Sequence, residues 1–227
     1  MQSTYTYKPD QYSSHSKIIK LIKPIKRPLK ILDIGCAQGY IAKKLSHLGH
    51  EVTGIESDKQ AAALAKEYCK KIHICNLDNK IPKLKKEYFD ILIFGDIIEH
   101  LKAPEQVLHH LLKSLKPKGL VIISVPNIAN IYIRLNLLLG RFNYTKKGIL
   151  DRTHLHFYTL KTIKKFIRKL DLRIIKTDKT PIPLPLVFPS TAKGKLFNFI
   201  HQINYLFTKI WKKLFAFQFI ILAKKNE

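Results

Sequence analysis

The chain has 227 residues, of which 46% are hydrophobic and 25% charged, so it is long enough to bury a substantial core and too apolar for a disordered protein. Its 41 lysines and arginines against 16 acidic residues give a net charge of +25, which favours polyanionic partners such as nucleic acid, acidic lipid headgroups or phosphorylated substrates. The lysines are spread along the whole chain, so a compositional bias explains the charge equally well.

Three features bear on the compartment. The three cysteines are odd in number and form no CxxC pair, which argues against a disulfide framework or a structural zinc site. The N-terminus lacks a secretory pattern, and no stretch approaches the roughly 20 apolar residues of a transmembrane helix. We therefore expect a cytoplasmic protein, with peripheral membrane contact left open.

The first half of the chain alternates between predicted helices and strands. Strands are predicted at 30–34, 51–55, 72–75, 89–94 and 120–125. Helices are predicted at 13–23, 38–48, 58–70 and 104–115. Short strands that are apolar throughout, alternating with amphipathic helices, are typical of a parallel sheet covered on both faces. The sequence therefore predicts an α/β, doubly wound domain.

The second half adds two late strands and two insertions. The pattern predicts helices at 128–139, 159–170 and 194–215, and strands at 172–176 and 217–223. The insertions are 128–157, which is apolar and then polar, and 181–215, which begins with four prolines and continues as a basic, aromatic helix.

The first predicted strand leads into the glycine-containing turn Asp33-Ile34-Gly35-Cys36-Ala37-Gln38-Gly39. Glycines at a strand-to-helix turn let a ligand approach the backbone, although a turn with positive φ also requires them. Ala37 and Tyr40 stand where the dinucleotide fingerprint GxGxxG has its later glycines, so pyrophosphate binding is poorly supported. Glu56 ends the second strand, where its carboxylate can accept both hydroxyls of a ribose or can cap the next helix.

These segments resemble a known family. ILDIGCAQGYIAKKL and VTGIESD are similar to motifs I and II of class I S-adenosylmethionine-dependent methyltransferases. FDILIFGDIIEHLKAPEQVLHHLLKSLKPKGLVIISVPN and GILDRTHLHFYTLKTIKKFI are similar to their later motifs, and together they resemble the bacterial subgroup related to ubiquinone-biosynthesis O-methyltransferases. The resemblance implies a Rossmann-like, seven-stranded, mostly parallel sheet with an antiparallel last strand, and a single domain over residues 1–227.

The resemblance also implies S-adenosylmethionine as cofactor. It would be held by Asp33, Gly35, Cys36, Gly39, Glu56, Ser57, Asn76, Leu77, Gly95 and Asp96. In this arrangement the turn after the first strand surrounds the methionine end, and Glu56 holds the ribose. Asn76 and Leu77 flank the adenine, and Gly95 brings backbone close to the sulfonium. The family more often has aspartate at position 76 and glycine at position 37.

Transfer of a methyl group to oxygen benefits from a base, and His100 and His154 are the candidates. Arg152 could orient an acidic acceptor, or could pair with Asp151 or Asp96. We expect the acceptor to be a small molecule or a saccharide or lipid-linked intermediate, methylated on oxygen and covered by the two insertions. Each histidine could instead be structural.

Two alternatives stay open. Asp96, Glu99 and His100 would share a face of a helical turn and, with His154, would suit a divalent cation. This set resembles that of the small-RNA 2′-O-methyltransferases and would imply metal-dependent RNA methylation. The second alternative is a catalytically silent protein of the same fold that presents its basic surface to a membrane or nucleic acid. The helix at 194–215 would pack on the sheet, cover the acceptor, or lie on lipid as a peripheral contact.

Overall fold

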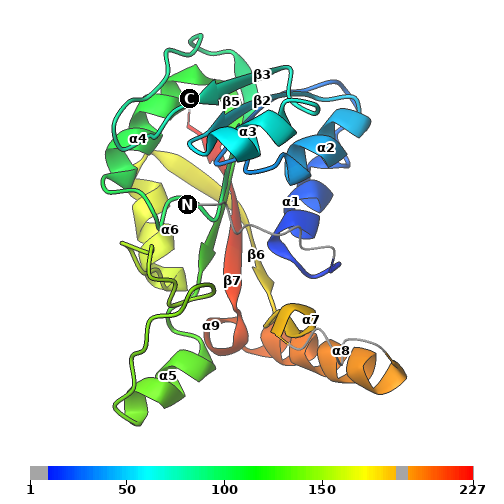
Figure 1. Ribbon diagram of the computed structural model, residues 1–227, viewed down its shortest axis with the longest axis vertical. Helices are drawn as coiled ribbons and strands as arrows, with labels where there is room; N and C mark the ends of the chain where they lie inside the picture. Colours follow the sequence, from blue (N-terminus) through cyan, green and yellow to red (C-terminus); the bar gives the residue numbers. More distant parts are fainter. Residues whose placement is uncertain (1–9, 188–193, 227) are drawn as a thin grey trace.

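A computed structural model of the chain describes residues 10–187 and 194–226. Seven strands form one sheet with the order β3-β2-β1-β4-β5-β7-β6 (Figure 1). They are β1 (Lys30–Ile34), β2 (Glu51–Glu56), β3 (Lys71–Ile74), β4 (Phe89–Gly95), β5 (Leu115–Pro126), β6 (Leu172–Thr180) and β7 (Gln218–Lys225). β7 runs antiparallel to both neighbours, and the remaining pairs are parallel. The predicted doubly wound, seven-stranded sheet with an antiparallel last strand is confirmed.

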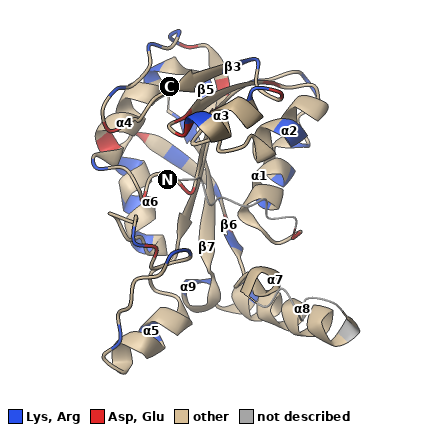
Figure 2. Ribbon diagram, viewed as in Figure 1, with Lys and Arg blue, Asp and Glu red and all other residues tan. Residues whose placement is uncertain are grey.

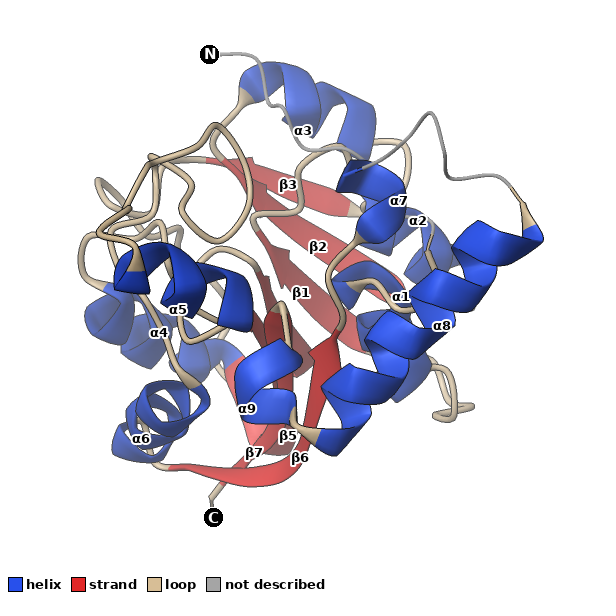
Figure 3. Ribbon diagram, turned by 90° about the horizontal axis from the view of Figure 1, so that it is seen from below, coloured by secondary structure: helices blue, strands red, loops and turns tan. Residues whose placement is uncertain are grey.

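Helices cover both faces of the sheet (Figure 3). The described helices are α1 (Ser14–Ile22), α2 (Tyr40–His47), α3 (Lys59–Ala65), α4 (Pro104–Leu111), α5 (Ile131–Leu138), α6 (Leu160–Lys169), α7 (Leu184–Val187), α8 (Lys195–Ile210) and α9 (Lys212–Phe215). The apolar residues of α1, α2 and α3 share one core with Ile91 and Ile93 of β4. Those of α4 and α6 share the opposite core with Leu92 and Phe94. This alternation follows the two-residue period of a strand and explains why the central strands are apolar throughout.

Asp58 and Thr159 begin two of the predicted helices, and the side chain of each caps its helix. Asp58 Oδ1 accepts hydrogen bonds from the N–H groups of Gln60 (2.8 Å) and Ala61 (3.0 Å) at the start of α3. Thr159 caps α6, where it exchanges hydrogen bonds with Thr162 in a capping box. These side chains satisfy N–H groups that have no partner within the helix.

The structure differs from the sequence prediction in the length of several elements. The helix predicted over 58–70 ends at Ala65, because the chain turns there and brings Cys69 into the core. β5 begins at Leu115 rather than at residue 120. The helix predicted over 194–215 is interrupted at Trp211, whose φ of −129° is not helical, and α7 was not predicted.

Both insertions leave the sheet at one end. Pro126 of β5 and Thr180 of β6 both lie opposite Gln218 at the start of β7. The first insertion, 128–157, carries α5, and the described part of the second, 181–215, carries α7, α8 and α9. This is the carboxyl end of the parallel strands, where doubly wound sheets bind their ligands. That the chain is a single domain and that the insertions cover an acceptor both stay predictions.

A separate finding concerns membranes. None of the described helices has the length and hydrophobicity needed to cross a bilayer.

Candidate functional site

The turn after β1 is built from left-handed residues. φ is 71° at Gly35, 46° at Ala37 and 78° at Gly39, and the Gly35 N–H donates to the Ile55 carbonyl at 2.8 Å. A side chain on Gly39 would place its Cβ only 2.9 Å from the Cα atom of Ala65. Packing of α2 against α3 therefore requires this glycine, and the turn lies against the end of β2.

The Glu56 carboxylate faces the same turn. Its Oε2 atom accepts a hydrogen bond from the N–H of Ala37 (2.8 Å), and its Oε1 atom accepts from the N–H groups of Ser57 (2.7 Å) and Asp58 (2.9 Å). The Ser57 hydroxyl adds a longer contact of 3.3 Å. Because Asp58 caps α3, Glu56 is not needed for that role, and its carboxylate is instead fixed between the two turns.

Asp33 is a buried carboxylate in β1. Its side chain is 2% exposed, and among the described residues its Oδ2 atom has no hydrogen-bond partner. Burial, and then the negative charge of Glu56, raise the pKa of Asp33 to about 7. A buried carboxylate is stabilised by a cationic partner, so this position fits the ammonium group of a ligand such as the methionine end of S-adenosylmethionine.

The remaining predicted cofactor residues lie around these carboxylates or pack beneath them. The N–H of Cys75 donates to the Glu56 carbonyl at 2.9 Å, which places Asn76 and Leu77 next to the end of β2. The Asn76 side chain is exposed and accepts a hydrogen bond from the Asp78 N–H, whereas Leu77 is buried in the main core. Cys36 is also buried, and a Cβ atom at Gly54 would lie 2.7 Å from its Sγ atom.

Gly95 is the last residue of β4, and Asp96 follows it. A Cβ atom on Gly95 would lie 3.8 Å from the nearest side-chain atoms, those of Ile18 and Ile41, so protein packing does not require glycine there. Asp96 has a φ of 55°, and its Oδ1 atom accepts a hydrogen bond from the Ser124 hydroxyl at 2.5 Å. Its Oδ2 atom contacts the Ser14 hydroxyl at 3.4 Å, so Asp96 connects β5 with α1.

His100 lies in the turn that follows β4 and is held by the first insertion. Its Nδ1 atom lies 3.0 Å from the Thr153 hydroxyl and 3.3 Å from the Thr153 carbonyl oxygen. The carbonyl can only accept and the hydroxyl donates to Asp151 at 2.7 Å, so we assign the proton to Nδ1 and the lone pair to Nε2. Burial and the neighbouring His154 lower the pKa of His100, which favours this neutral form.

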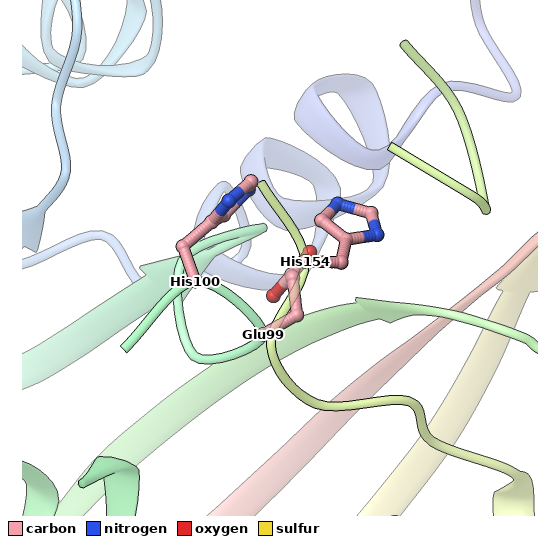
Figure 4. A group of neighbouring side chains, drawn as sticks. All are labelled: Glu99, His100 and His154. Atoms are coloured by element: carbon pink, nitrogen blue, oxygen red, sulfur yellow. The ribbon is translucent and has the colours of Figure 1, made fainter. Parts of the chain in front are cut away.

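Glu99, His100 and His154 form a cluster whose potential ligand atoms lie within 4.8 Å of one another (Figure 4). His154 is buried, its Nδ1 atom lies 3.0 Å from the Ile149 carbonyl oxygen, and burial lowers its pKa. The two imidazole rings meet edge to face at 4.7 Å. In metal sites, a backbone carbonyl that bonds to one ring nitrogen of a histidine orients the other nitrogen toward the metal. The set of Glu99, His100 and His154 therefore fits a divalent cation.

One residue of the predicted metal set is not in the cluster. Asp96, Glu99 and His100 were expected to share a face of a helical turn, and Asp96 does not belong to the group that the other two form with His154. The reason is that 96–100 forms an irregular turn, with Asp96 in a left-handed conformation and bonded to Ser124.

Arg152 lies close to this cluster in sequence but is exposed. In the part of the chain that the structure describes, its guanidinium has no ion pair with Asp151 or Asp96. Asp151 instead accepts hydrogen bonds from the Thr153 N–H and hydroxyl. A role in orienting an acceptor stays a prediction.

Thr153, which holds His100, and Asp151, which holds Thr153, were not predicted to have these roles. The local signal was available, since an aspartate two residues before a threonine commonly forms an Asx turn. What the sequence does not contain is the proximity of this turn to residue 100, which depends on the insertion folding back. That fold is fixed where the N–H groups of Leu155 (2.8 Å) and His156 (3.1 Å) donate to the Glu99 carbonyl.

Comparisons with known proteins bear on this arrangement. A family model described as a methyltransferase domain matches residues 7–177. A ubiquinone biosynthesis O-methyltransferase of Rickettsia typhi is 33% identical over 123 residues, which cover 50% of this chain and 50% of that protein. Another from Bradyrhizobium diazoefficiens is 28% identical over 160 residues, covering 68% of this chain and 61% of that protein. The matched region thus spans little more than half the length of these relatives.

Solved structures agree in fold. A SAM-dependent methyltransferase from Archaeoglobus fulgidus superimposes with a TM-score of 0.64 at 18% identity, covering 93% of this chain and 92% of that one. Phosphoethanolamine N-methyltransferase 2 of Haemonchus contortus, in complex with S-adenosyl-L-methionine, gives 0.63 at 16% identity and covers 94% and 52%. At these identities the likeness shows the fold alone. The family model matches well over half of the chain and confirms the predicted family: the chain belongs to the S-adenosylmethionine-dependent methyltransferases, whose cofactor is S-adenosylmethionine.

Proposed function

We propose that the chain methylates a hydroxyl oxygen of a small acceptor, free or linked to a lipid or saccharide, with His100 as general base. The observation that carries this proposal is the fixed orientation of His100. His100 lies in the turn that follows Gly95, its Nδ1 atom is held by Thr153, and this contact leaves the basic lone pair of the neutral ring on Nε2. The O-methyltransferase relatives support oxygen as the methylated atom, since their names describe this reaction.

The described residues suit the cofactor at two points. Asp33 offers a buried carboxylate oxygen to the ammonium group, and Glu56 offers a carboxylate to the ribose, where a ligand hydroxyl can displace the long contact from the Ser57 hydroxyl. Bound S-adenosylmethionine supplies an electrophilic methyl group on its sulfonium. The chain's contribution is to position the acceptor oxygen and to exclude water from it.

In the proposed step, His100 Nε2 would accept the proton of the acceptor hydroxyl while the oxygen bonds to the methyl carbon and the bond from that carbon to sulfur breaks, with S-adenosylhomocysteine as the leaving group. Proton removal raises the nucleophilicity of the oxygen at the moment of attack, an effect that typically contributes 10²–10⁴-fold. His154 packs edge to face on His100 and limits the motion of its ring. Arg152 is exposed at the same insertion and would contact an acidic group of the acceptor.

Radiolabelled methyl transfer to lysate fractions separated into lipid, glycan, small-molecule and RNA pools would identify the acceptor. With that acceptor, we expect His100→Gln to lower kcat about 10²-fold while calorimetry shows unchanged cofactor affinity. His110→Gln, on the exposed face of α4, is the matched control and should retain full activity. Equal loss of cofactor affinity and of turnover in His100→Gln would mean that this residue is structural.

The cluster of Glu99, His100 and His154 supports a second candidate, metal-dependent 2′-O-methylation of RNA. In that case both histidines would be ligands, and the ion would lower the pKa of the attacking hydroxyl. Activity that survives thorough chelation and is recovered in the lipid, glycan or small-molecule pool would exclude this candidate. Loss of activity on chelation, restored by one divalent ion and confined to the RNA pool, would favour it over the first.

A further inference from the structure

A large set of apolar side chains is exposed at the end of the molecule that carries the insertions. On the first insertion these are Tyr132 (62% exposed), Leu135 (52%), Leu137 (50%), Leu138 (82%), Leu139 (67%), Phe142 (40%) and Tyr144 (48%). On the second they are Leu186 (47%), Val187 (52%), Leu196 (73%), Phe199 (59%), Ile200 (47%), Leu206 (54%), Phe207 (51%), Ile210 (74%) and Trp211 (59%). We call these residues together the apolar end. Large exposed apolar surfaces of soluble proteins usually mark a site of contact with a partner or a membrane.

The orientation of α8 is the reverse of that expected for a helix packed on a core. Its buried side chains are polar: His201 is 7% exposed and Thr208 is 0% exposed. His201 bonds to Asp10 at 3.1 Å, and Tyr205 stacks on Tyr12 at 4.2 Å. Leu196, Phe199 and Ile210, by contrast, face outward. The sequence leaves three roles open for this helix, which are packing on the sheet, covering the acceptor and lying on lipid. Its outward apolar face favours contact with lipid.

α5 shows the same pattern. Within this helix only Ile133 is buried, and it joins Ile149 and Leu150 in a small cluster that anchors the insertion. The leucines of α5 are exposed and do not pack in a core. Two helices from different insertions thus expose apolar faces, and both lie at the carboxyl end of β5 and β6 (Figures 1 and 3).

The charge of this end identifies its partner. The sequence has no aspartate or glutamate from 128 to 150 or from 179 to 226, while Arg134, Arg141, Lys146, Lys147, Lys209, Lys212 and Lys213 are all exposed (Figure 2). Apolar side chains mixed with lysines and arginines, and without acids, suit the interface of a bilayer that contains anionic lipids. A second copy of the chain would bring two cationic surfaces together, and a nucleic acid would leave the leucines in water.

We propose that the apolar end docks on an anionic lipid bilayer, with α5 and α8 as two separate points of insertion. This surface lies outside the cofactor site and does not depend on the chemistry of the acceptor. Its position at the ligand-binding end of the sheet would bring the site close to the bilayer.

The single tryptophan of the chain provides a direct probe. Trp211 lies between α8 and α9 and is 59% exposed. Titration with phosphatidylglycerol–phosphatidylcholine vesicles should shift its emission to shorter wavelength, and pure phosphatidylcholine should shift it far less. Higher salt should weaken the binding without abolishing it, because the apolar contribution remains.

Charge substitutions test the two insertion points separately. Leu138→Glu on α5 and Ile210→Glu on α8 should each lower vesicle partitioning about tenfold or more. Leu64→Glu, on α3 at the opposite end of the molecule, is the matched control, because Leu64 is 56% exposed and should have no effect on partitioning. Calorimetry with S-adenosylmethionine should give wild-type affinity for all three variants, which separates this inference from the proposed function.

Three outcomes would overturn the proposal. The first is a Trp211 emission that does not respond to anionic vesicles. The second is an emission that is already blue-shifted without lipid and shifts back on dilution, together with a dimer in sedimentation, which would make the apolar end a self-association surface. The third is binding to RNA but not to vesicles that is lost in Leu138→Glu and Ile210→Glu.

Discussion

Asp33 and Glu56 are neighbouring carboxylates that differ in their hydrogen bonding. Glu56 receives hydrogen bonds from three backbone N–H groups, whereas Asp33 is buried with one oxygen that has no partner among the described residues. Strongly perturbed carboxylates of this kind concentrate at functional sites, because the energy that burial costs is recovered when a ligand binds. We therefore assign Asp33 to the cationic end of the cofactor.

The raised pKa of Asp33 predicts a pH dependence of cofactor binding. The free protein holds a proton on Asp33 below about pH 7, and a cationic ligand requires the carboxylate. Affinity should therefore rise from pH 6 to pH 8, by up to tenfold per unit below the pKa, and become flat above it. Calorimetry across this range would measure it, and an affinity that does not change with pH would contradict the assignment.

Substitution of Asp33 gives the matching test of stability. Because burial raises the pKa of Asp33 from 3.8 to about 7, the free protein loses stability as pH rises between these two values, and the loss is constant above about pH 7. Asp33→Asn should raise the melting temperature at pH 8 by ~2–6 °C without cofactor and abolish the stabilisation that cofactor gives. A lower melting temperature together with retained cofactor stabilisation would show that Asp33 is structural.

Two glycines of the site should respond differently to the same substitution. At Gly95 the added Cβ atom has ordinary contacts of 3.8 Å, so Gly95→Ala should fold normally and lose cofactor affinity if backbone approaches the ligand there. At Gly39 the Cβ atom would lie 2.9 Å from a backbone atom and φ is 78°, so Gly39→Ala should be destabilised by ~1–3 kcal/mol. Chemical denaturation and calorimetry on both variants would separate the two effects. Unchanged cofactor affinity in Gly95→Ala would remove Gly95 from the site.

At the scale of elements, the first insertion matters because it positions His100. Thr153→Val removes the hydroxyl between Asp151 and His100 Nδ1 and leaves only the longer carbonyl contact. We expect kcat to fall about threefold to tenfold, with unchanged cofactor affinity, and Thr153→Ser to restore it. A Thr153→Ser variant as slow as Thr153→Val would show that the hydroxyl has no positioning role.

α1 is attached to the far edge of the sheet by one buried ion pair. Lys17 Nζ lies 3.0 Å from Asp178 Oδ1 on β6, and the lysine side chain is only 7% exposed. Lys17→Met leaves the Asp178 carboxylate without this partner and should lower the free energy of unfolding by about 1–3 kcal/mol. The exposed pair of Lys70 and Glu51 is the control, and Lys70→Met should cost less than 1 kcal/mol. Equal costs in urea denaturation would mean that the Lys17 pair does not anchor α1.

The order of helices and strands can be predicted from local sequence patterns. Contacts between residues far apart in the chain cannot. Continuously apolar strands between capped helices predict the doubly wound sheet, because burial on both faces leaves no other pattern. Asp96 shows where prediction from sequence spacing fails. The spacing i, i+3 and i+4 places Asp96 beside His100 only if the chain is helical there, and the chain forms an irregular turn instead. The contact of Thr153 with His100 joins residues 53 positions apart and depends on how the insertion folds back.

At the scale of the whole molecule, the predicted cofactor residues and the exposed apolar helices lie toward the same end of the sheet. The turns that carry Gly35, Glu56 and Gly95 follow parallel strands, and α5 and α8 extend beyond the carboxyl ends of β5 and β6. The net charge of +25 does not identify a partner by itself. Its meaning comes from the arrangement, because α5 and α8 contain basic residues but no acids and expose leucines and phenylalanines at one end of the molecule.

We propose that S-adenosylmethionine binds between the turn at 35–39 and the carboxylate of Glu56. Calorimetric titration of the wild type and of Glu56→Gln with S-adenosylmethionine tests it most directly. We predict saturable binding of one equivalent to the wild type and an affinity lowered at least tenfold in Glu56→Gln, with both proteins equally folded by circular dichroism. Equal affinities of the two proteins, or a flat titration of the wild type, would contradict the account.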